Sequence, residues 1–464
     1  MVAGDVVDAI RSSEDILALA TGLLAICRDH LVELTEHDTD PALWRRSDRL
    51  RRDAQQLFRR VDDEQLDDDE RAELCDLVAE AFAALPACLV ARAVADALDA
   101  ELGFRFLPMF LNRQVTLHEG DAVPTPHPDW RNLSPTPNSD PWALDGRLDA
   151  LPHLRLAGDW SRHVRVTLDG DWRTWHALPQ LDAGDKLACA VPNDSFEEFD
   201  WDAGVVEQRR VFYNVRPNVG DDEQTRRCIE LLDIAREQRC RIVAFPELSV
   251  PKHTLAAMRR WLERQNTVEV IVAGSRHKRA RDGRWHNEAT LLLRGLPKLR
   301  HRKFRPFSFT DTVTQKNKRI RRAELLSVRT PKLTAHLSAN WTVTMLICKD
   351  VVAEPLPTLL ADLRANLVLV PCLSFKMDAF RSAAGTVASR GQGISLIANA
   401  AISLRGRRRG RPPIIIGLPS QVGSVIARVP PTGSLLVVTL GNNRTPGRVE
   451  VVDKTVLLRK LTTF

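Results

Sequence analysis

The feature of this sequence that most constrains its fold is an alternation of short β-branched runs with amphipathic segments, which begins after residue 205. Alternation of this kind is typical of α/β domains, in which helices pack on the faces of sheets. Strands outnumber helices in the pattern, so we expect two packed sheets with helices outside them. Helices are predicted at 223–238, 253–264 and 355–363. Strands are predicted at 210–215, 241–245, 268–274, 341–347, 367–371, 394–399, 414–417, 424–429 and 434–440, with a hairpin of 289–294 and 298–302 around Gly295.

Two regions precede this α/β domain, which we assign to 206–464. Residues 1–104 carry apolar side chains at helical spacing, and the acidic cluster Asp67 to Glu70 suits a helix start, so this region is predicted to be mainly helical. Residues 105–205 are rich in proline and tryptophan, which excludes a long helix. We interpret them as a connector or small accessory domain whose tryptophans pack on a neighbour. The alternative is an aromatic recognition surface.

The cysteines and the N-terminus indicate a compartment. The eight cysteines are irregularly spaced and include no C-x-x-C pair, so neither a zinc site nor a disulfide framework is indicated. Reduced thiols fit the cytoplasm. The most apolar early stretch, Leu17 to Cys27, is about half of the ~20 residues that a membrane span requires. We therefore expect neither a signal peptide nor a membrane anchor.

Basic residues are concentrated in two segments, Lys298 to Arg322 and Arg405 to Arg411, although the net charge of the chain is only +6. A surface for nucleic acid or another polyanion is one interpretation. We favour a solvated face or a subunit contact, because the arginine run lacks interleaved aromatic residues. Arg405 to Arg411 is expected to form an exposed loop, and nucleic acid is not an expected partner.

Three polar residues stand where predicted strands end: Glu247, Lys303 and Cys348. An α/β fold normally places its functional site at such strand ends. Taken alone, each residue has an ordinary role, as a helix cap, a surface lysine or a small core residue. Together they suit nucleophilic catalysis. A free thiol is mostly protonated at neutral pH, so a carboxylate must take its proton during attack, and a cation with a backbone N–H can stabilise the charge that develops on the substrate.

The segments around these residues follow one another in a recognisable order. An apolar strand leads into Phe245-Pro-Glu247, His301-Arg-Lys303 follows a strand that itself follows Asn287, and another apolar strand ends on Cys348-Lys-Asp350. This order resembles the nitrilase superfamily of carbon–nitrogen hydrolases, which carries Phe-Pro-Glu, Arg-Lys and Cys-x-Asp/Glu segments. The resemblance covers about 206–445 and also includes Phe212 to Asp221, Ser389-Arg390 with Ile397 to Asn399, and Gly417 to Ser420 with Val425 to Gly433.

The resemblance implies an α/β fold in the form of a four-layer α-β-β-α sandwich, with a catalytic triad in it. Cys348 would be the nucleophile, Glu247 the base and Lys303 the oxyanion-stabilising cation, assisted by the backbone N–H of Lys349. The family has a second glutamate between lysine and cysteine, and Glu324 is the only glutamate in 304–347. Glu324 is therefore the candidate fourth member, although its arginine-rich surroundings differ from the family pattern. Lys349 also departs from that pattern, which leaves the shape of the substrate open and allows an acidic substrate group.

Asn287 and Cys372 are the remaining candidates for the pocket. Cys372 ends a predicted strand where the family has a small polar residue, and we interpret it as pocket wall rather than a second nucleophile. Asn287 either contacts the substrate or serves as a buried amide that holds a turn, which is the commoner use. The histidines show no metal-ligand spacing with a carboxylate, so neither a metal nor a cofactor is expected.

These observations predict a cytoplasmic hydrolase that cleaves a non-peptide carbon–nitrogen bond through a thioester on Cys348. A small-molecule amide is favoured over a nitrile, because amidases form the larger share of the superfamily, and the resemblance implies a homo-oligomer. One alternative is a sensor or scaffold with a weak or lost site, whose N-terminal region binds a protein partner. Another is an acyltransferase, in which an amine and not water takes the thioester.

Overall fold

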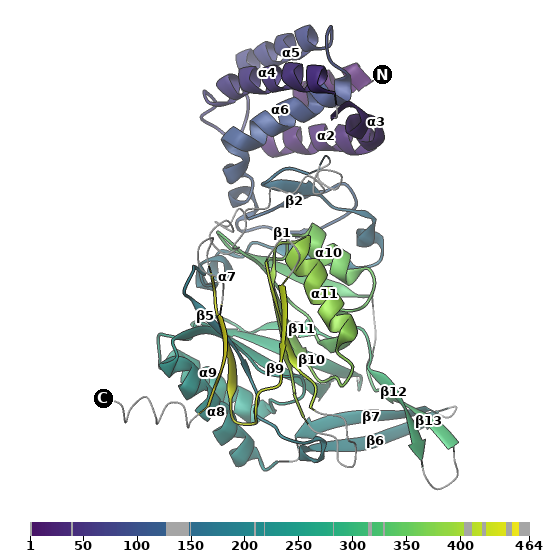
Figure 1. The fold of residues 1–464 in the computed structure, drawn as a ribbon, viewed down its shortest axis with the longest axis vertical. Helices are drawn as coiled ribbons and strands as arrows, with labels where there is room; N and C mark the ends of the chain where they lie inside the picture. Colours follow the sequence, from purple (N-terminus) through teal and green to yellow (C-terminus); the bar gives the residue numbers. More distant parts are fainter. Residues whose placement is uncertain are drawn as a thin grey trace. The chain divides into compact units, whose positions relative to one another are not determined.

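The chain folds into two compact units in a computed structural model (Figure 1). The structure describes residues 2–38, 40–126, 148, 150–207, 210–217, 219–281, 283–313, 318–327, 330–402, 411–419, 424–441 and 448–453. The first unit comprises 1–127 and 139–162, and the second comprises 128–138 and 163–464. Helices dominate the first unit and sheets the second, so the chain has the mixed α/β character that its sequence predicts.

Most of the described part of the first unit is helical. The acidic cluster does start a helix: the Asp67 carboxylate accepts from the Glu70 backbone N–H at 2.7 Å, and the Glu70 carboxylate accepts from the Asp67 N–H at 2.9 Å. Capping of this kind stabilises a helix by about 0.5–2 kcal/mol. The helices are α1 (Val2–Ser12), α2 (Ile16–Asp29), α3 (Leu31–Asp38), α4 (Pro41–Phe58), α5 (Asp68–Ala81) and α6 (Ala87–Leu102). They are followed by η1 (Gly103–Arg105), η2 (Pro108–Phe110), β1 (Gln114–Thr116), β2 (Ala122–Pro124), β3 (Leu154–Leu156) and η5 (Asp159–Arg162).

The first sheet of the second unit is parallel at its centre. Its strands β15, β16 and β17 run parallel to one another, and β18 and β19 continue the sheet in antiparallel fashion. The order is β4 (Arg165–Asp169), β14 (Lys332–Leu337), β15 (Thr342–Met345), β16 (Leu367–Cys372), β17 (Ile394–Asn399), β18 (Ile414–Leu418) and β19 (Ser424–Arg428). The strands predicted between 341 and 429 are therefore present.

The second sheet has a parallel core of β5, β8 and β9, flanked by antiparallel strands. Its order is β11 (Leu299–Arg302), β10 (Trp285–Leu293), β9 (Val270–Arg279), β8 (Cys240–Ala244), β5 (Lys186–Ala190), β20 (Leu435–Thr439) and β21 (Arg448–Val452). Strands β8 and β9 of this sheet approach β16 of the first, and β5 approaches β17. The predicted hairpin is β10 and β11, joined through Gly295 with a φ of 69°.

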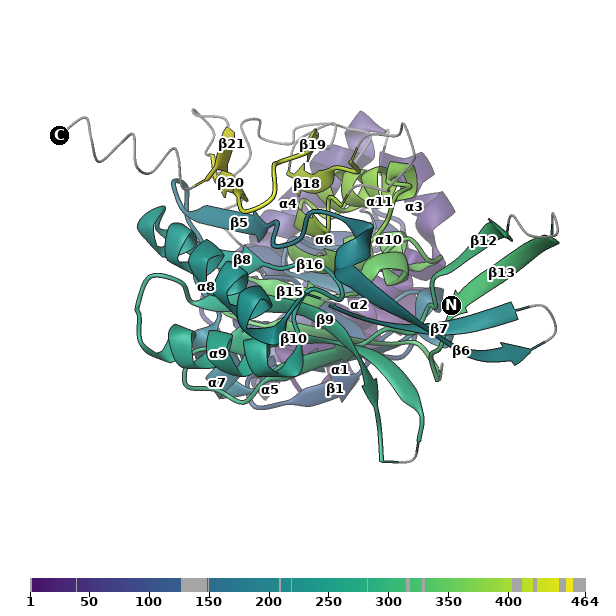
Figure 2. The ribbon, with the colours of Figure 1, turned by 90° about the horizontal axis from the view of Figure 1, so that it is seen from below.

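Helices cover both sheets. Leu231 and Leu232 of α8 (Asp221–Glu237) and Leu255 and Met258 of α9 (Lys252–Glu263) belong to one apolar core with the second sheet. Helix α11 (Asp378–Ser389) packs on β17, β18 and β19, and α10 (Leu356–Asp362) packs on α11. Figure 2 shows α8 and α9 on one side of the strands and α10 and α11 on the other. The short helices of this unit are α7 (Trp172–Ala177), η6 (Phe196–Glu198) and η7 (Cys348–Asp350).

The start of the second unit differs from the sequence-based expectation. Strand β5 lies inside the stretch interpreted as a connector, yet it pairs with β8 on one side and β20 on the other. The unit therefore begins near His163, well before the boundary drawn at 206. A run of small apolar residues among prolines carries little strand signal, and only its burial between two neighbours reveals its place.

The strand expected at 210–215 is also placed differently. It corresponds to β7 (Arg210–Pro217), which lies outside both large sheets, in a smaller sheet of order β12-β13-β7-β6. It pairs with β6 (Phe199–Glu207) and β13 (Lys318–Glu324), and β12 (Ser308–Val313) pairs with β13. Figure 1 shows these strands grouped at one end of the second unit. In the sequence, β6 and β7 form an antiparallel pair between β5 and α8.

Other expectations are only partly covered by the described residues. Trp160 is buried at 3% exposure, whereas Trp172 is 50% exposed, so the tryptophans do not share one role.

Most of the proline-rich segment, at 127–147, lies outside the described residues, as do Arg405 to Gly410 of the arginine run, Asn218 and Ser420. Across the part of the chain that is described, no helix combines the length and the apolar character needed to cross a membrane.

Candidate functional site

The structure brings Glu247, Lys303 and Glu324 into direct contact. The Lys303 ammonium donates to Glu247 Oε1 at 2.7 Å and to Glu324 Oε2 at 2.6 Å. These residues come from three strand ends: Glu247 follows β8, Lys303 follows β11, and Glu324 ends β13. None of the three side chains is more than 3% exposed. Glu324, the candidate fourth member, is thus as close to the lysine as Glu247 is.

Asn287 and His277 complete this polar cluster from the neighbouring strands β10 and β9. The Asn287 amide donates to Glu247 Oε1 at 2.8 Å and to Glu324 Oε1 at 2.7 Å. Nδ1 of His277 accepts from the Val215 backbone N–H at 2.7 Å, so the ring carries its proton on Nε2, which lies 2.7 Å from Glu324 Oε1 and donates to it. Asn287 is a buried amide that binds two carboxylates, rather than one that holds a turn.

The pKa values of Glu247 and Glu324 are shifted in opposite directions. Burial raises the pKa of Glu247, the Lys303 ammonium lowers it and the Glu324 charge raises it again, with a net result above its usual value. Burial also raises the pKa of Glu324, but Lys303 and the hydrogen bond from His277 outweigh it and hold that pKa well below its usual range. Glu324 is therefore a permanent anion, whereas Glu247 is the carboxyl group that can exchange a proton.

Lys303 is a permanent cation. Burial lowers its pKa, but Glu247 and Glu324 raise it by more, so the pKa of Lys303 lies well above its usual value. Its backbone N–H also donates to the Asn287 carbonyl at 2.9 Å, which fixes the start of the side chain. A lysine held this way offers a fixed positive charge in a site that excludes water.

The turn that presents Glu247 depends on close backbone packing. Leu248, the next residue, adopts a φ of 63°, which is uncommon for a residue with a side chain. Gly274 of β9 has a φ of 52°, and a Cβ atom on it would collide with the Pro246 carbonyl oxygen. Lys303 and Asn287 bind Oε1 of Glu247, and the Leu373 backbone N–H donates to Oε2 at 3.0 Å, so both oxygens of the carboxylate are held in place.

Cys348 sits at the start of η7, where β15 has ended, and is fully buried. Its φ of 48° lies in the left-handed region, a strained conformation that the surrounding contacts must maintain. The Cys348 thiol is one of the groups that lower the pKa of Glu247, so it lies beside that carboxyl group. The nucleophile, base and cation candidates therefore meet around one point.

Asp350 links the turn of Cys348 to the segment of Lys303. Its Oδ1 accepts from the backbone N–H groups of Phe304 at 3.2 Å and Arg305 at 2.9 Å. Its Oδ2 accepts from the Ile347 N–H at 3.3 Å and lies 3.0 Å from His301 Nε2. Asp350 is fully buried, so these contacts tie together two loops that are distant in the sequence.

Cys372 and Leu373 lie against Cys348 at the end of β16. The Cys372 thiol donates to Cys348 Sγ at 3.7 Å, and the Cys348 thiol lies 3.9 Å from the Leu373 carbonyl oxygen. Burial and the neighbouring Cys348 raise the pKa of Cys372 well above its usual value, so it remains a thiol. Cys372 thus contacts the candidate nucleophile, in keeping with a place in the wall of the site.

An apolar cluster adjoins the polar one. It includes Leu248 and Leu373, the residues next to Glu247 and Cys372, and a rim of half-buried aromatic residues packs against it. The Lys349 ammonium lies 5.1 Å from the centre of the Phe307 ring, within the range of a cation–π contact. The rim consists of Phe196, Trp201, Phe307 and Phe375.

The opposite face of the same strands carries a different ionic group. Glu288 of β10 is 1% exposed and has basic neighbours on both flanking strands. Lys278 lies 3.5 Å, Arg300 3.7 Å and Arg302 3.3 Å from its carboxylate, and these cations are 41%, 50% and 57% exposed. Part of the basic segment that begins at Lys298 is therefore a solvated sheet face.

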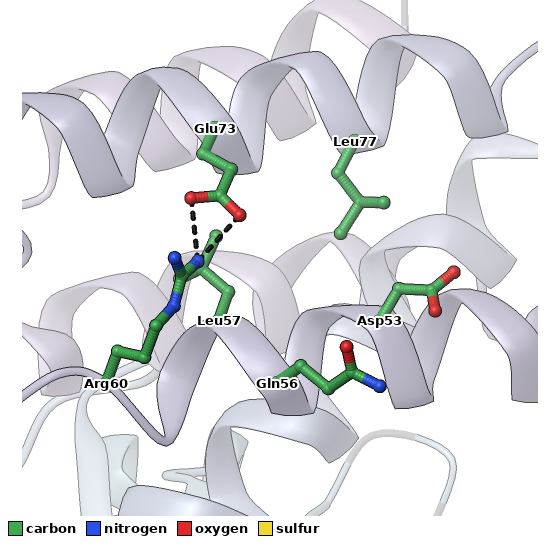
Figure 3. A pocket seen from close by; sticks show the side chains of 6 residues that line it. All are labelled: Asp53, Gln56, Leu57, Arg60, Glu73 and Leu77. Carbon is green, nitrogen blue, oxygen red and sulfur yellow. Dashed lines mark hydrogen bonds and ion pairs between the residues drawn. The ribbon is translucent and has the colours of Figure 1, made fainter.

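A hollow also lies in the first unit, between α4 and α5 (Figure 3). Its volume is about 570 Å³. The Arg60 guanidinium on its wall is paired with both Glu73 oxygens, at 2.6 and 2.7 Å. The hollow contains no cysteine, serine or histidine among its lining residues, so the cluster around Cys348 is the better candidate for chemistry. The lining residues are Asp53, Gln56, Leu57, Arg60, Glu73 and Leu77.

Sequence reasoning missed His277, His301 and Asp350 as members of the site. His277 was considered only as a metal ligand, although its alternation with Asn287 on paired strands places both on one face: Asn287 lies opposite His277 in the register of β9 and β10. Asp350 was part of a motif without an assigned role. The signal that could have found His277 is this cross-strand register, but the strands predicted at 268–274 and 289–294 include neither His277 nor Asn287.

Comparisons with known proteins add a similarity of fold. No family model and no curated protein matches the sequence. Among solved structures, Nit3 of Saccharomyces cerevisiae, a member of branch 10 of the nitrilase superfamily, is similar with a TM-score of 0.38 and 14% identity, over 61% of this chain and 95% of that one. An amidase from Nesterenkonia sp. has a TM-score of 0.34 and 14% identity, over 61% of this chain and 98% of that one.

The NitFhit protein of C. elegans is similar with a TM-score of 0.40 and 13% identity, over 61% of this chain and 65% of that one. At these identities and TM-scores, the reaction has to be inferred from the site itself. Over 61% of its length, the chain is similar to structures of the nitrilase superfamily, the family that its motif order resembles.

Proposed function

We propose that this protein hydrolyses a small-molecule amide through a thioester on Cys348. The observation that carries the proposal is the meeting of a buried thiol, a carboxyl group of raised pKa and a buried cation, since Cys348 lowers the pKa of the neighbouring Glu247 and Lys303 donates to Glu247 at 2.7 Å. Each of the three reacting groups required for acyl transfer through a cysteine is present.

The proposed first step is attack on the amide carbon. Glu247 takes the proton of Cys348 as the sulfur forms its bond to carbon, and the carbonyl electron pair moves onto oxygen. The raised pKa of Glu247 suits this exchange, since a base with a pKa closer to neutral can both take and return a proton. Lys303 and the backbone N–H of Lys349 are proposed to stabilise the oxyanion.

The second half of the cycle uses the same carboxyl group. Protonated Glu247 gives its proton to the nitrogen as the carbon–nitrogen bond breaks, which releases an amine or ammonia and leaves the thioester. Water then donates a proton to Glu247 and attacks the thioester, which returns the Cys348 thiol and a carboxylic acid. Glu324 and Asn287 hold Lys303 and Glu247 in place throughout.

The surroundings favour a substrate with an apolar part. Leu248, Leu373 and the aromatic rim adjoin the polar cluster, so the substituents of the amide would be removed from water there. Glu247, Lys303 and Cys348 are at most 4% exposed, so a substrate has to displace part of this rim to reach them. We also propose that the two sheets and the helices that cover them form the four-layer α-β-β-α arrangement.

Reaction with a thiol probe tests the proposal. We expect limited iodoacetamide to alkylate Cys348 first, because burial raises the pKa of Cys88 to about 11 and those of Cys189 and Cys240 to about 12. Labelling of Cys348 should fall in Glu247→Gln. Cys75→Ala, a change in the first unit, is the matched control and should leave the labelling of Cys348 unchanged.

Product analysis separates the remaining alternatives. Release of ammonia from a panel of small apolar amides, lost in Cys348→Ala, is the expected result. Formation of a substituted amide when an amine is added would favour acyl transfer over hydrolysis. Uniformly slow labelling of all the cysteines, with no ammonia release, would instead support the sensor or scaffold alternative.

A further inference from the structure

A second thiol lies against the proposed nucleophile. Cys372 Sγ is 3.7 Å from Cys348 Sγ, and both residues are fully buried. Cys372 is the last residue of β16, and Cys348 begins η7 just after the neighbouring parallel strand β15, in which Met345 is opposite Leu369. Adjacent strands lie about 4.8 Å apart, which is within the Cα separation of roughly 4.4–6.8 Å that a disulfide spans.

The two thiols differ in the way that a reactive pair requires. Cys348 lies beside Glu247, which can take its proton during attack, and near the Lys303 ammonium. Cys372 is held as a thiol by burial and by its neighbour, which raise its pKa. One sulfur is therefore suited to react first with an electrophile, and the other to supply the second thiol.

We propose that Cys348 and Cys372 form a peroxide-driven modification site, in which Cys372 resolves oxidised Cys348 into a reversible disulfide. The proposal rests on the proposed function only for the reactivity of Cys348. Hydrogen peroxide, or an organic hydroperoxide, is the oxidant. Any path that admits an amide to Cys348 also admits hydrogen peroxide, which is smaller.

The chemistry balances in two steps. The Cys348 thiolate attacks one peroxide oxygen, the O–O bond breaks, and hydroxide leaves with its electron pair, so sulfur is oxidised to a sulfenic acid and peroxide is reduced. Cys372 then attacks the sulfenic sulfur: the S–S bond forms, the S–O bond breaks, and the thiol proton leaves with the hydroxyl group as water. Closing the gap from 3.7 Å to a bond of about 2.05 Å requires small side-chain rotations.

The disulfide would protect Cys348 from overoxidation. It inactivates the proposed nucleophile reversibly and prevents further oxidation to sulfinic or sulfonic acid, which thiols cannot reverse. Reduction by a dithiol would restore both cysteines. This pair is distinct from Cys228 and Cys240, which are buried in the apolar core between the second sheet and its helices.

Peroxide treatment of the full-length protein tests the proposal. After brief exposure to hydrogen peroxide, free thiols are counted by mass spectrometry with maleimide blocking in denaturant. The wild-type protein should lose two of its eight thiols, a peptide linking Cys348 to Cys372 should appear, and dithiothreitol should restore the count. Cys75→Ser serves as the matched control and should lose the same two thiols.

The variant Cys372→Ser distinguishes the resolving role from simple oxidation. It should give a dimedone-reactive Cys348 that proceeds to sulfinic acid and is no longer restored by dithiothreitol. Wild-type protein in which Cys348 is overoxidised while Cys372 stays free, or in which neither thiol reacts, would overturn the proposal. Since the readout is a thiol count, a disulfide without ammonia release would refute the hydrolase and leave the modification site standing.

Discussion

The strands β9, β10 and β11 carry an ionic group on each of their two faces, and the two groups are built in opposite ways. On the inner face, the Lys303 ammonium forms ion pairs with two buried carboxylates at 2.6 and 2.7 Å. On the outer face, the buried Glu288 carboxylate pairs with three partly exposed cations at 3.3 to 3.7 Å. The same backbone thus supports both a fixed polar cluster and a looser solvated one.

The difference follows from exposure to water. The cations around Glu288 are partly exposed and remain solvated, so each ion pair contributes little to stability. Inside, Lys303, Glu247 and Glu324 are bound by one another, by Asn287 and His277 and by backbone groups, so each contact has to be made at good geometry. The inner group therefore has fixed charges and two carboxyl groups of different pKa, as a catalytic mechanism requires. The outer group has neither.

Removal of the inner cation should have the largest effect. Lys303→Met leaves two buried carboxylates without their cation, and we expect it to lower the free energy of unfolding by about 3–5 kcal/mol. Urea unfolding followed by circular dichroism measures the loss. Lys278→Met on the outer face is the matched control, with an expected loss of about 0–1 kcal/mol. Equal losses in the two variants would show that the faces do not differ as described.

Substitution of the proposed base should affect the reaction rather than the fold. Glu247→Gln keeps an oxygen acceptor for Lys303 but cannot take a proton, and amide hydrolysis is expected to fall by about 10²–10⁴-fold. Initial rates of ammonia release measure it, with circular dichroism as the check on folding. Glu288→Gln, the corresponding change on the outer face, should leave the rate unchanged. A Glu247→Gln variant of normal activity would remove this residue from the mechanism.

The pH dependence should report the coupling between the two inner carboxylates. Since the pKa of Glu247 is raised above 4.5, kcat/KM should increase with pH through a value higher than that. The Glu324 charge is one cause of the rise, so Glu324→Gln should move the acid limb to lower pH. An acid limb of the kcat/KM profile that stays at the same pH or moves to higher pH would contradict the effect of the Glu324 charge on the pKa of Glu247.

Glu324→Gln should also change how stability depends on pH. The folded pKa of Glu324 is lowered, so its charge stabilises the folded state above the pKa of the unfolded chain, and this stabilisation is lost as pH falls through the folded pKa. The stability difference between wild type and variant should therefore shrink on acidification. Unfolding in urea at a series of acidic pH values provides the measurement.

The smallest effect is expected on the outer face. Arg302 is 57% exposed and lies 3.3 Å from Glu288, which has other cations beside it. Arg302→Gln should change stability by about 0–1 kcal/mol, and the change should diminish further at high salt, which screens exposed charges. Urea unfolding at low and high ionic strength is the test. A loss as large as that of Lys303→Met would show that the outer cations also act as a fixed cluster.

The strand ends that carry Glu247 and Cys348 could be predicted because each depends on a local pattern. An apolar run followed by proline or a turn marks where a strand stops, as it does after β8 and β15, whereas β11 is Leu-Arg-His-Arg and Lys303 could be assigned only from the order of the motifs. The first strand of the unit could not be placed this way. Strand β5 is a short run of small apolar residues, and the more strand-like β7 joins a different sheet.

By itself, the sequence determined the alternation of strands and helices, the order of the three reactive residues and the charge of their neighbours, since these depend on residues close together in the chain. Tertiary structure alone decided which groups touch. Glu324 reaches Lys303 across 21 residues, His277 reaches Glu324 across 47, and the Leu373 N–H reaches Glu247 across 126. Cys372 meets Cys348 because their strands are neighbours in one sheet, and contacts of this kind depend on register and burial rather than on any local pattern.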